Sequence, residues 1–124
     1  MSSGTATSAT ALFEIGQIVH HRLFDYRGVV VDVDAVFQGG EEWYRQMARS
    51  QPPKDKPWYH VLVDESDNHT YVAERNLQPA SDLRPIKHSM LSDSAMRYEN
   101  GRYLVERHLV RFRVRNRNDF APQQ

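Results

Sequence analysis

Alternating apolar and polar residues near the start of the chain predict a β-hairpin. The segments GQIVHHRLF (16–24) and RGVVVDVDAVF (27–37) each read as a strand, and Asp25 and Gly28 suit the turn that joins them. In the second strand, a period of two places valines on one face and aspartates on the other. The valines are Val29, Val31 and Val33, and the aspartates are Asp32 and Asp34.

A second hairpin is predicted from WYHVLVD (58–64) and HTYVAE (69–74), which flank the polar loop ESDN. The side chains of its first strand divide into two faces, one with Tyr59, Val61 and Val63 and the other with Trp58, His60 and Leu62. The first set is the more uniformly apolar, so we expect it to face the core. The second set would then form the less buried face.

The rest of the chain adds one helical insertion to these strands. Residues 41–49 contain good helix formers between a glycine pair and a proline pair, which predicts a short helix or an ordered excursion. Residues 80–101 read as a loop with a helical turn around Leu91–Arg97, and alternation returns after Gly101. Short strands with one helical insertion predict a mainly all-β fold, either a small antiparallel barrel or a curled sheet.

Length and composition narrow the class of protein. A chain of 124 residues has room for one domain, which we expect over residues 13–104. Residues 2–11 are only Ser, Gly, Thr and Ala, so residues 1–12 are expected to form a disordered arm, and 105–124 an arginine-rich strand and tail. The absence of cysteine excludes disulfides and thiolate zinc sites and fits a cytoplasmic location. No membrane span and no secretory signal are predicted.

Four blocks of sequence together resemble the YccV-like hemimethylated-DNA-binding domain, a family whose bacterial members include the heat-shock protein HspQ. The blocks are FEIGQIVHHRLFDYRGVVVDVD, PWYHVLVD, TYVAERNL and IKHSMLSDSAMRYENGRY, in this order. The resemblance implies a small SH3-like antiparallel β-barrel with no catalytic activity. It also implies binding of hemimethylated DNA and a stress role in which the protein influences degradation by ATP-dependent proteases. The arginine-rich tail beyond residue 105 departs from the short enteric-type members.

The residues that could carry catalysis or bind a metal form no motif of known spacing. His20 and His21 are adjacent on a strand and point to opposite faces, so they cannot both serve one site. The chain has no HExxH, no EF-hand loop and no glycine-rich phosphate loop. Several carboxylates share a strand face or a loop, but no nucleophile accompanies them. These are Asp32, Asp34, Asp64, Glu65 and Asp67. We therefore expect no enzymatic activity, no cofactor and no metal.

Trp58 and His60 admit two interpretations. In the structural one, His60 orients the hairpin by a hydrogen bond and Trp58 packs under residues 41–49. In the functional one, the two rings form a surface on which an unpaired or distorted base stacks. The structural interpretation is the stronger, because aromatic residues at the start of a strand usually contribute packing.

Basic residues make the better case for nucleic acid. Arg22, Tyr26 and Arg27 lie on or next to the first turn, and arginines recur on alternate residues of the tail. The tail arginines proposed to contact DNA are Arg111, Arg113, Arg115 and Arg117. Such a row can bind phosphates through bidentate hydrogen bonds or enter a narrow groove. The alternative is an edge strand whose arginines pair with carboxylates across the sheet, since sixteen basic residues balance sixteen acidic ones.

Two functional hypotheses follow from these observations. The first is a non-enzymatic DNA-binding protein that contacts the DNA backbone through an arginine-rich face. One methyl group is worth about 1 kcal/mol or less, so strong discrimination of hemimethylated DNA needs shape readout or cooperative assembly in addition. The second is a heat-shock adaptor that binds an ATP-dependent protease or its client proteins. Self-association into a homo-oligomer is compatible with either.

Overall fold

The computed structural model describes residues 11–47, 51–91 and 96–105, and both hairpins predicted from alternation are present in it. Five strands form one antiparallel sheet in the order β4-β3-β2-β1-β5. The strands are β1 (Ile18–His21), β2 (Arg27–Asp34), β3 (Trp58–Val63), β4 (His69–Ala73) and β5 (Leu77–Pro79). The prediction of a mainly all-β fold is therefore confirmed.

The sheet is not closed into a barrel, so that part of the prediction is wrong. Strands β4 and β5 lie at the two edges, and no pairing joins them in the part of the chain that the structure describes. Strand β5 is poorly suited to pair with a further strand. It has three residues, all three pair with β1, and it ends at Pro79, which has no N–H group to donate to a further strand.

A β-bulge in β2 changes which of its side chains share a face. Val30 pairs with Val61, but the next pair along the strand is Asp32 with His60, so Val31 is an extra residue. As a result Val33 packs with Val30 and not with Val29. The predicted grouping of three valines opposite two aspartates is wrong, because it assumed an uninterrupted period of two.

Both faces of the sheet are covered, and β3 is buried at all six positions. One face packs against residues 80–91 and a second, two-stranded sheet; on the other face, side chains of the sheet itself pack together with Phe13. The prediction that Tyr59, Val61 and Val63 face the core is confirmed, whereas the prediction of a less buried opposite face is wrong. An uninterrupted run such as WYHVLV is typical of a strand covered on both sides.

The predicted helical insertion is present as α2 (Glu41–Met47), and residues 48–50 lie outside the described part of the chain. Trp43 is its one buried residue and packs against Phe37, Trp58 and Tyr71. Two 3₁₀ turns, η2 (Glu74–Asn76) and η3 (Ser89–Leu91), complete the helical elements of the described residues.

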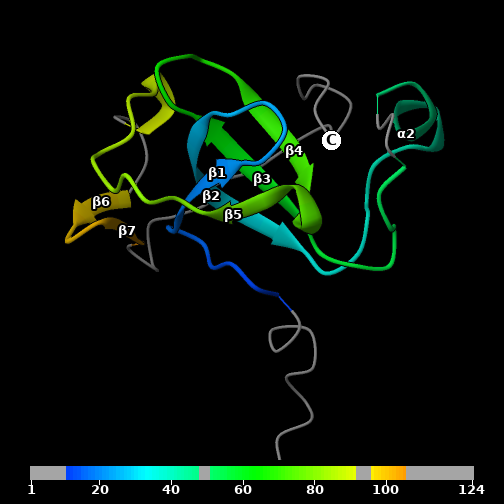
Figure 1. Ribbon diagram of the computed structural model, residues 1–124, viewed down its shortest axis with the longest axis horizontal. Coiled ribbons are helices and arrows are strands. Elements are labelled where there is room, and N and C mark those ends of the chain that lie inside the picture. Colours follow the sequence, from blue (N-terminus) through cyan, green and yellow to red (C-terminus); the bar gives the residue numbers. More distant parts are fainter. Residues whose placement is uncertain (1–10, 48–50, 92–95, 106–124) are drawn as a thin grey trace, which may run out of the picture.

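A third hairpin, β6 (Met96–Glu99) with β7 (Arg102–Val105), was not predicted. The helical turn expected around Leu91–Arg97 is therefore wrong from Met96 onward. The missed signal was Asn100-Gly101: φ is 53° at Asn100 and 85° at Gly101, as a type I′ turn requires, and Asn-Gly is the preferred sequence for it. In Figure 1 this hairpin and α2 lie at opposite ends of the molecule, with the five-stranded sheet between them.

Gly16 joins the third hairpin to the main sheet. Its N–H donates to Val30 O (2.7 Å) and its carbonyl accepts from Tyr103 N (2.8 Å). Its φ is +96°, and a Cβ atom there would lie 2.0 Å from Tyr103 O. Only glycine permits both the backbone angle and the close approach.

Candidate nucleic-acid interface

A buried histidine builds the turn between β1 and β2. The ring of His21 is fully buried, and its Nδ1 accepts hydrogen bonds from the backbone N–H groups of Leu23 (3.1 Å) and Phe24 (3.0 Å). A ring nitrogen accepts only when it carries no proton, so these bonds assign the Nε2–H tautomer. The ring also packs against Phe24 and Tyr26, with centroid distances of 4.7 and 5.1 Å.

The far side of the same turn is fixed by His20 and Asp25. Asp25 adopts a left-handed conformation with φ of 55°, and its Oδ1 lies 2.6 Å from His20 Nε2. His20 Nδ1 in turn lies 3.0 Å from Gln78 Nε2 on β5. The turn is thus held from both sides, and it leaves Leu23 and Phe24 58% and 47% exposed at its tip.

A groove lined by three basic side chains begins at Arg22, next to this tip. The groove has a volume of about 410 Å³. Its lining consists of Leu12, Arg22, Pro53, Lys56, Ala73, Glu74, Arg75 and Leu77. Arg22 Nη1 donates to Arg75 O (3.2 Å), and its backbone N–H donates to Asn76 O (2.8 Å). Arg22, Lys56 and Arg75, three basic residues from separate segments, therefore line one hollow.

The single carboxylate of the groove, Glu74, is already hydrogen-bonded. Its Oε2 accepts from Tyr59 Oη (2.6 Å) and from Leu12 N (3.0 Å). Burial, followed by the hydrogen bond to Glu74, raises the pKa of the Tyr59 hydroxyl, which therefore keeps its proton. The groove thus combines three cations with one carboxylate whose charge is partly compensated, and this favours an anionic ligand.

Tyr26, predicted as a contact residue, is half-buried. Its hydroxyl hydrogen-bonds to Thr70 Oγ1 (2.9 Å), and burial raises the pKa of that hydroxyl. The side chain packs beside the core cluster of Val30 and Tyr59. Its main role in this conformation is to connect the turn to β4.

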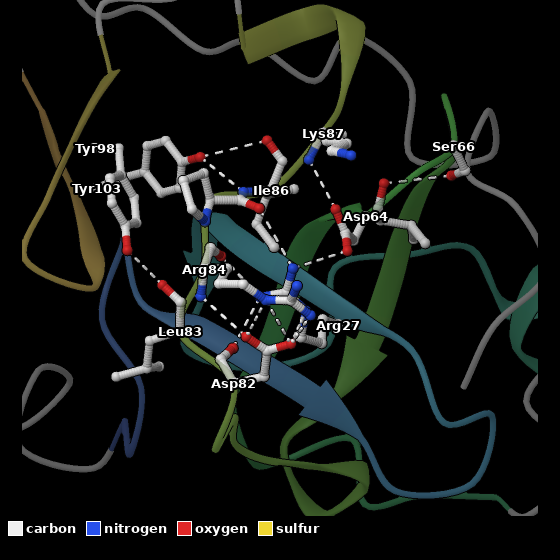
Figure 2. Close-up of polar contacts among 12 residues, drawn as sticks. Arg27, Asp64, Ser66, Asp82, Leu83, Arg84, Ile86, Lys87, Tyr98 and Tyr103 are labelled. Atoms are coloured by element: carbon white, nitrogen blue, oxygen red, sulfur yellow. Dashed lines mark hydrogen bonds and ion pairs between the residues drawn. The ribbon is translucent and has the colours of Figure 1, made fainter.

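Arg27 forms an anchor inside the fold (Figure 2). Its Nη1 donates to the carbonyls of Asp82 and Arg84, both at 2.8 Å, and its Nη2 donates to Asp64 Oδ2 (2.9 Å) and Pro85 O (3.3 Å). The side chains of Arg27 and Asp64 are each 15% exposed. A phosphate could reach this guanidinium only by displacing these bonds.

Residues 82–86 form a segment that we call the strap. Two tyrosines of the third hairpin hold it in addition to Arg27. Tyr98 Oη donates to Leu83 O (2.6 Å), and Tyr103 Oη donates to Ile86 O (3.4 Å) while accepting from Ile86 N (2.9 Å). With the three bonds from Arg27, every carbonyl of the strap accepts a side-chain hydrogen bond (Figure 2). Asp64 Oδ1 also accepts from Lys87 N (2.7 Å), directly after the strap.

Trp58 and His60 are both fully buried. Trp58 packs against Phe37 (4.8 Å between ring centroids) and Trp43 (6.2 Å), and its Nε1 donates to Pro53 O (3.0 Å). His60 Nε2 lies 3.2 Å from Asp34 Oδ2. A base could stack on either ring only if the covering side chains moved away.

Asp34, predicted above to lie with Asp32 on the face opposite Val29, Val31 and Val33, belongs to this buried cluster. Its Oδ2 also accepts from Tyr71 Oη (2.6 Å), and Tyr71 Oη accepts from Gln38 N (2.9 Å). The side chain is 11% exposed. The bulge in β2 explains the error, because it turns Asp34 toward His60 and Trp58.

The predicted row of arginines from Arg111 to Arg117 lies outside the described residues. Sequence reasoning missed Lys56 and Arg75, which lie far apart in the sequence from Arg22 and meet it only in the folded chain. No group of three or more His, Cys, Asp or Glu side chains suited to a metal ion occurs within the described ranges. None of the helices described is long and apolar enough to cross a membrane.

Comparison with known protein families assigns the fold to a family. The family model described as "Hemimethylated DNA-binding protein YccV like" matches residues 11–102. This range includes all strands of the main sheet, the groove and the strap. The chain therefore belongs to the YccV-like family of hemimethylated-DNA-binding proteins.

Proposed function

We propose that this protein binds DNA without catalysing a reaction and contacts the DNA backbone through its basic side chains. Membership of the YccV-like family carries the proposal. The groove around Arg22, Lys56 and Arg75 supports it, because lysine and arginine contacts with phosphates supply most of the affinity of proteins for DNA. The tail arginines Arg111, Arg113, Arg115 and Arg117 are proposed as a second set of backbone contacts. This function fits a cytoplasmic location.

The salt dependence of binding tests this proposal directly. The affinity of the full chain for matched unmethylated, hemimethylated and fully methylated duplexes would be measured across a salt series. Each phosphate contact that is lost should reduce the slope of log K against log salt by about one unit. We expect the triple variant Arg22→Gln/Lys56→Gln/Arg75→Gln to bind more weakly and with a smaller slope.

The matched control removes basic side chains that lie outside the groove. Arg84 and Arg97 are 81% and 59% exposed and pair with Asp82 and Glu99 respectively. The double variant Arg84→Gln/Arg97→Gln should retain the salt slope of the wild type. The control removes two positive charges and the groove variant three, so a loss in the control of about two thirds of that in the groove variant would assign the effect to overall charge. Absence of binding by the wild type would reject DNA as the ligand.

A second candidate function is that of an adaptor for an ATP-dependent protease or its clients, and exposed apolar side chains favour it. Leu12 is 71% exposed at the rim of the groove, and Leu23 and Phe24 are exposed nearby. An amphipathic segment of another protein could cover them. A degradation assay with purified protease and client, with and without this protein, tests the idea; an unchanged rate and client choice would reject it.

A further inference from the structure

We propose that the turn between β1 and β2 recognises the methyl group of methylated DNA, with Leu23 and Phe24 as the contacting side chains. This inference rests on the proposed function and assigns its methyl recognition to one element. The two side chains are exposed, adjacent and apolar, and they form the tip of a hairpin. A methyl group is itself apolar, so its recognition requires an apolar contact that an unmethylated base does not offer.

The rigidity of the turn suits this role. The two hydrogen bonds to His21 Nδ1 come from the backbone N–H groups of Leu23 and Phe24 themselves. Because His21 is fully buried, its ring fixes the backbone of the tip before any ligand arrives. A preformed contact surface loses less conformational entropy on binding than a flexible loop would.

The dimensions of DNA place this tip in the major groove. That groove is about 12 Å wide and admits a two-stranded β-ribbon, whereas the minor groove is about 6 Å wide. The methyl groups of thymine and of bases methylated at the same edge lie in the major groove, where apolar side chains contact them. A hairpin tip with two apolar residues therefore has both the size and the chemistry for this position.

The charges on one side of the tip, where Arg22 lies, fit a duplex that lies across it, whereas the exposed Asp25 carboxylate on the other side repels phosphates. Arg22 precedes the tip and lines the basic groove with Lys56 and Arg75, where phosphates of the adjacent backbone would bind. The carboxylate of Asp25 follows the tip and contacts His20. His20 lines a different hollow, together with Gln78 and Pro79.

The test compares methylated and unmethylated duplexes that are otherwise identical. The probes are duplexes with one N6-methyladenine or one 5-methylcytosine on a single strand, and the protein is the full chain. One buried methyl group is worth about a fourfold difference in affinity. We expect the wild type to show a preference of this size and the double variant Leu23→Ala/Phe24→Ala to lose it while retaining salt-dependent binding.

Two further variants keep the test interpretable. Leu23→Ala alone leaves the contact between Phe24 and the His21 ring in place, so the turn should keep its shape while the preference falls. Val36→Ala removes an exposed apolar side chain beyond the opposite end of β2 and should leave the preference unchanged.

The outcomes separate this inference from the proposed function. Variants that keep the wild-type methyl preference, or lose affinity equally for all duplexes, would overturn the assignment of methyl recognition to the tip while DNA binding stands. A wild type that binds all duplexes equally would overturn it as well. A wild type that binds no duplex would reject the proposed function itself. If the tip variants no longer changed the rate of proteolysis in the degradation assay but bound DNA as the wild type does, the tip would be assigned to a protein partner.

Discussion

At the scale of single residues, two arginines of one turn differ in environment: one lies at the surface and the other is enclosed by the fold. Arg22 and Arg27 flank one turn and are alike in sequence terms, yet Arg22 lines a groove while Arg27 is enclosed by Asp64 and the strap. Nothing local in the sequence separates them. The distinction arises because Arg27 begins β2, which pairs with β3 and so brings Asp64 alongside Arg27.

Substitution of Arg27 should destabilise the fold. Arg27→Ala leaves the partly buried Asp64 carboxylate and three strap carbonyls without their donor, which we expect to cost about 3 kcal/mol in the free energy of unfolding. Arg27→Lys should recover only part of this loss, because an ammonium group cannot reproduce the planar guanidinium fork. Denaturant unfolding measures both. Arg84→Lys, at an exposed ion pair, serves as the control, and a similar loss there would argue against an anchoring role for Arg27.

His69 should make the protein less stable in mild acid. Burial first, and the nearby His60 and His88 second, lower the pKa of His69 from 6.5 to about 4. Between these values the unfolded chain binds a proton that the folded chain does not, so stability falls as the pH drops from about 6.5 toward 4. For this residue alone we expect a loss of about 2 kcal/mol between pH 7 and pH 5.

Two measurements check the behaviour of His69. NMR titration should show its ring neutral well below the pKa of an ordinary histidine. His69→Gln should weaken the acid dependence of the unfolding free energy. Equal acid dependence in wild type and His69→Gln would show that other groups dominate.

At the scale of elements, alternation predicted both hairpins of the main sheet, and its failures have physical causes. Val31 is an extra residue in β2, so Val33 and Asp34 lie on the opposite faces from those predicted. The pattern of apolar residues along a strand does not indicate where a bulge occurs. The burial of His60 and Trp58 depends on cover from distant segments. The third hairpin was predictable from Asn100-Gly101, which combines the strongest short hairpin signal with alternating flanks.

Gly16→Ala should detach the third hairpin from the main sheet. The new Cβ would overlap Tyr103 O, and the positive φ adds backbone strain, so we expect a loss of at least about 2 kcal/mol in unfolding free energy. Hydrogen exchange should show faster exchange of the Tyr103 amide, which bonds to Gly16 O. Ile15→Ala, at the preceding exposed position, is the matched control. Unchanged protection of Tyr103 in Gly16→Ala would contradict the proposed coupling.

The contact of α2 with the sheet can be followed by fluorescence. Trp43 and Trp58 are the two tryptophans of the chain, so a Trp43 variant reports Trp58 alone. Trp43→Phe should keep Trp58 shielded from acrylamide, because an aromatic ring still covers it. Trp43→Ala should increase quenching and cost about 3 kcal/mol or more of stability. Equal quenching in both variants would show that α2 does not shield Trp58.

At the scale of the molecule, the formal net charge is zero, but basic residues are distributed unevenly over the folded chain. The composition gave no argument for a polyanionic partner, yet folding brings Arg22, Lys56 and Arg75 together around one groove. Sequence reasoning identified only Arg22 of these three, since the others become neighbours through the pairing of β1 with β5 and the path of residues 51–57. A site assembled from separate segments leaves no local motif to detect.

The sheet order also predicts where the fold opens first. Strands β1, β2 and β3 have a neighbour on each side, and β2 and β3 are the longest strands of the sheet, whereas β5 is short and lies at an edge. Native-state hydrogen exchange should therefore show the slowest exchange in β2 and β3 and faster exchange in β5 and the third hairpin. Slowest exchange in the third hairpin would contradict this order of stability.

The strap has a consequence for sequence variation. Arg27, Tyr98 and Tyr103 hold it by main-chain carbonyls, which every amino acid possesses. Evolution, or a protein engineer, can therefore change the exposed side chains of Arg84 and Pro85 without loosening the attachment. These two positions offer a rigid platform on which new surface specificity, or a reporter group, can be introduced at little cost to the fold.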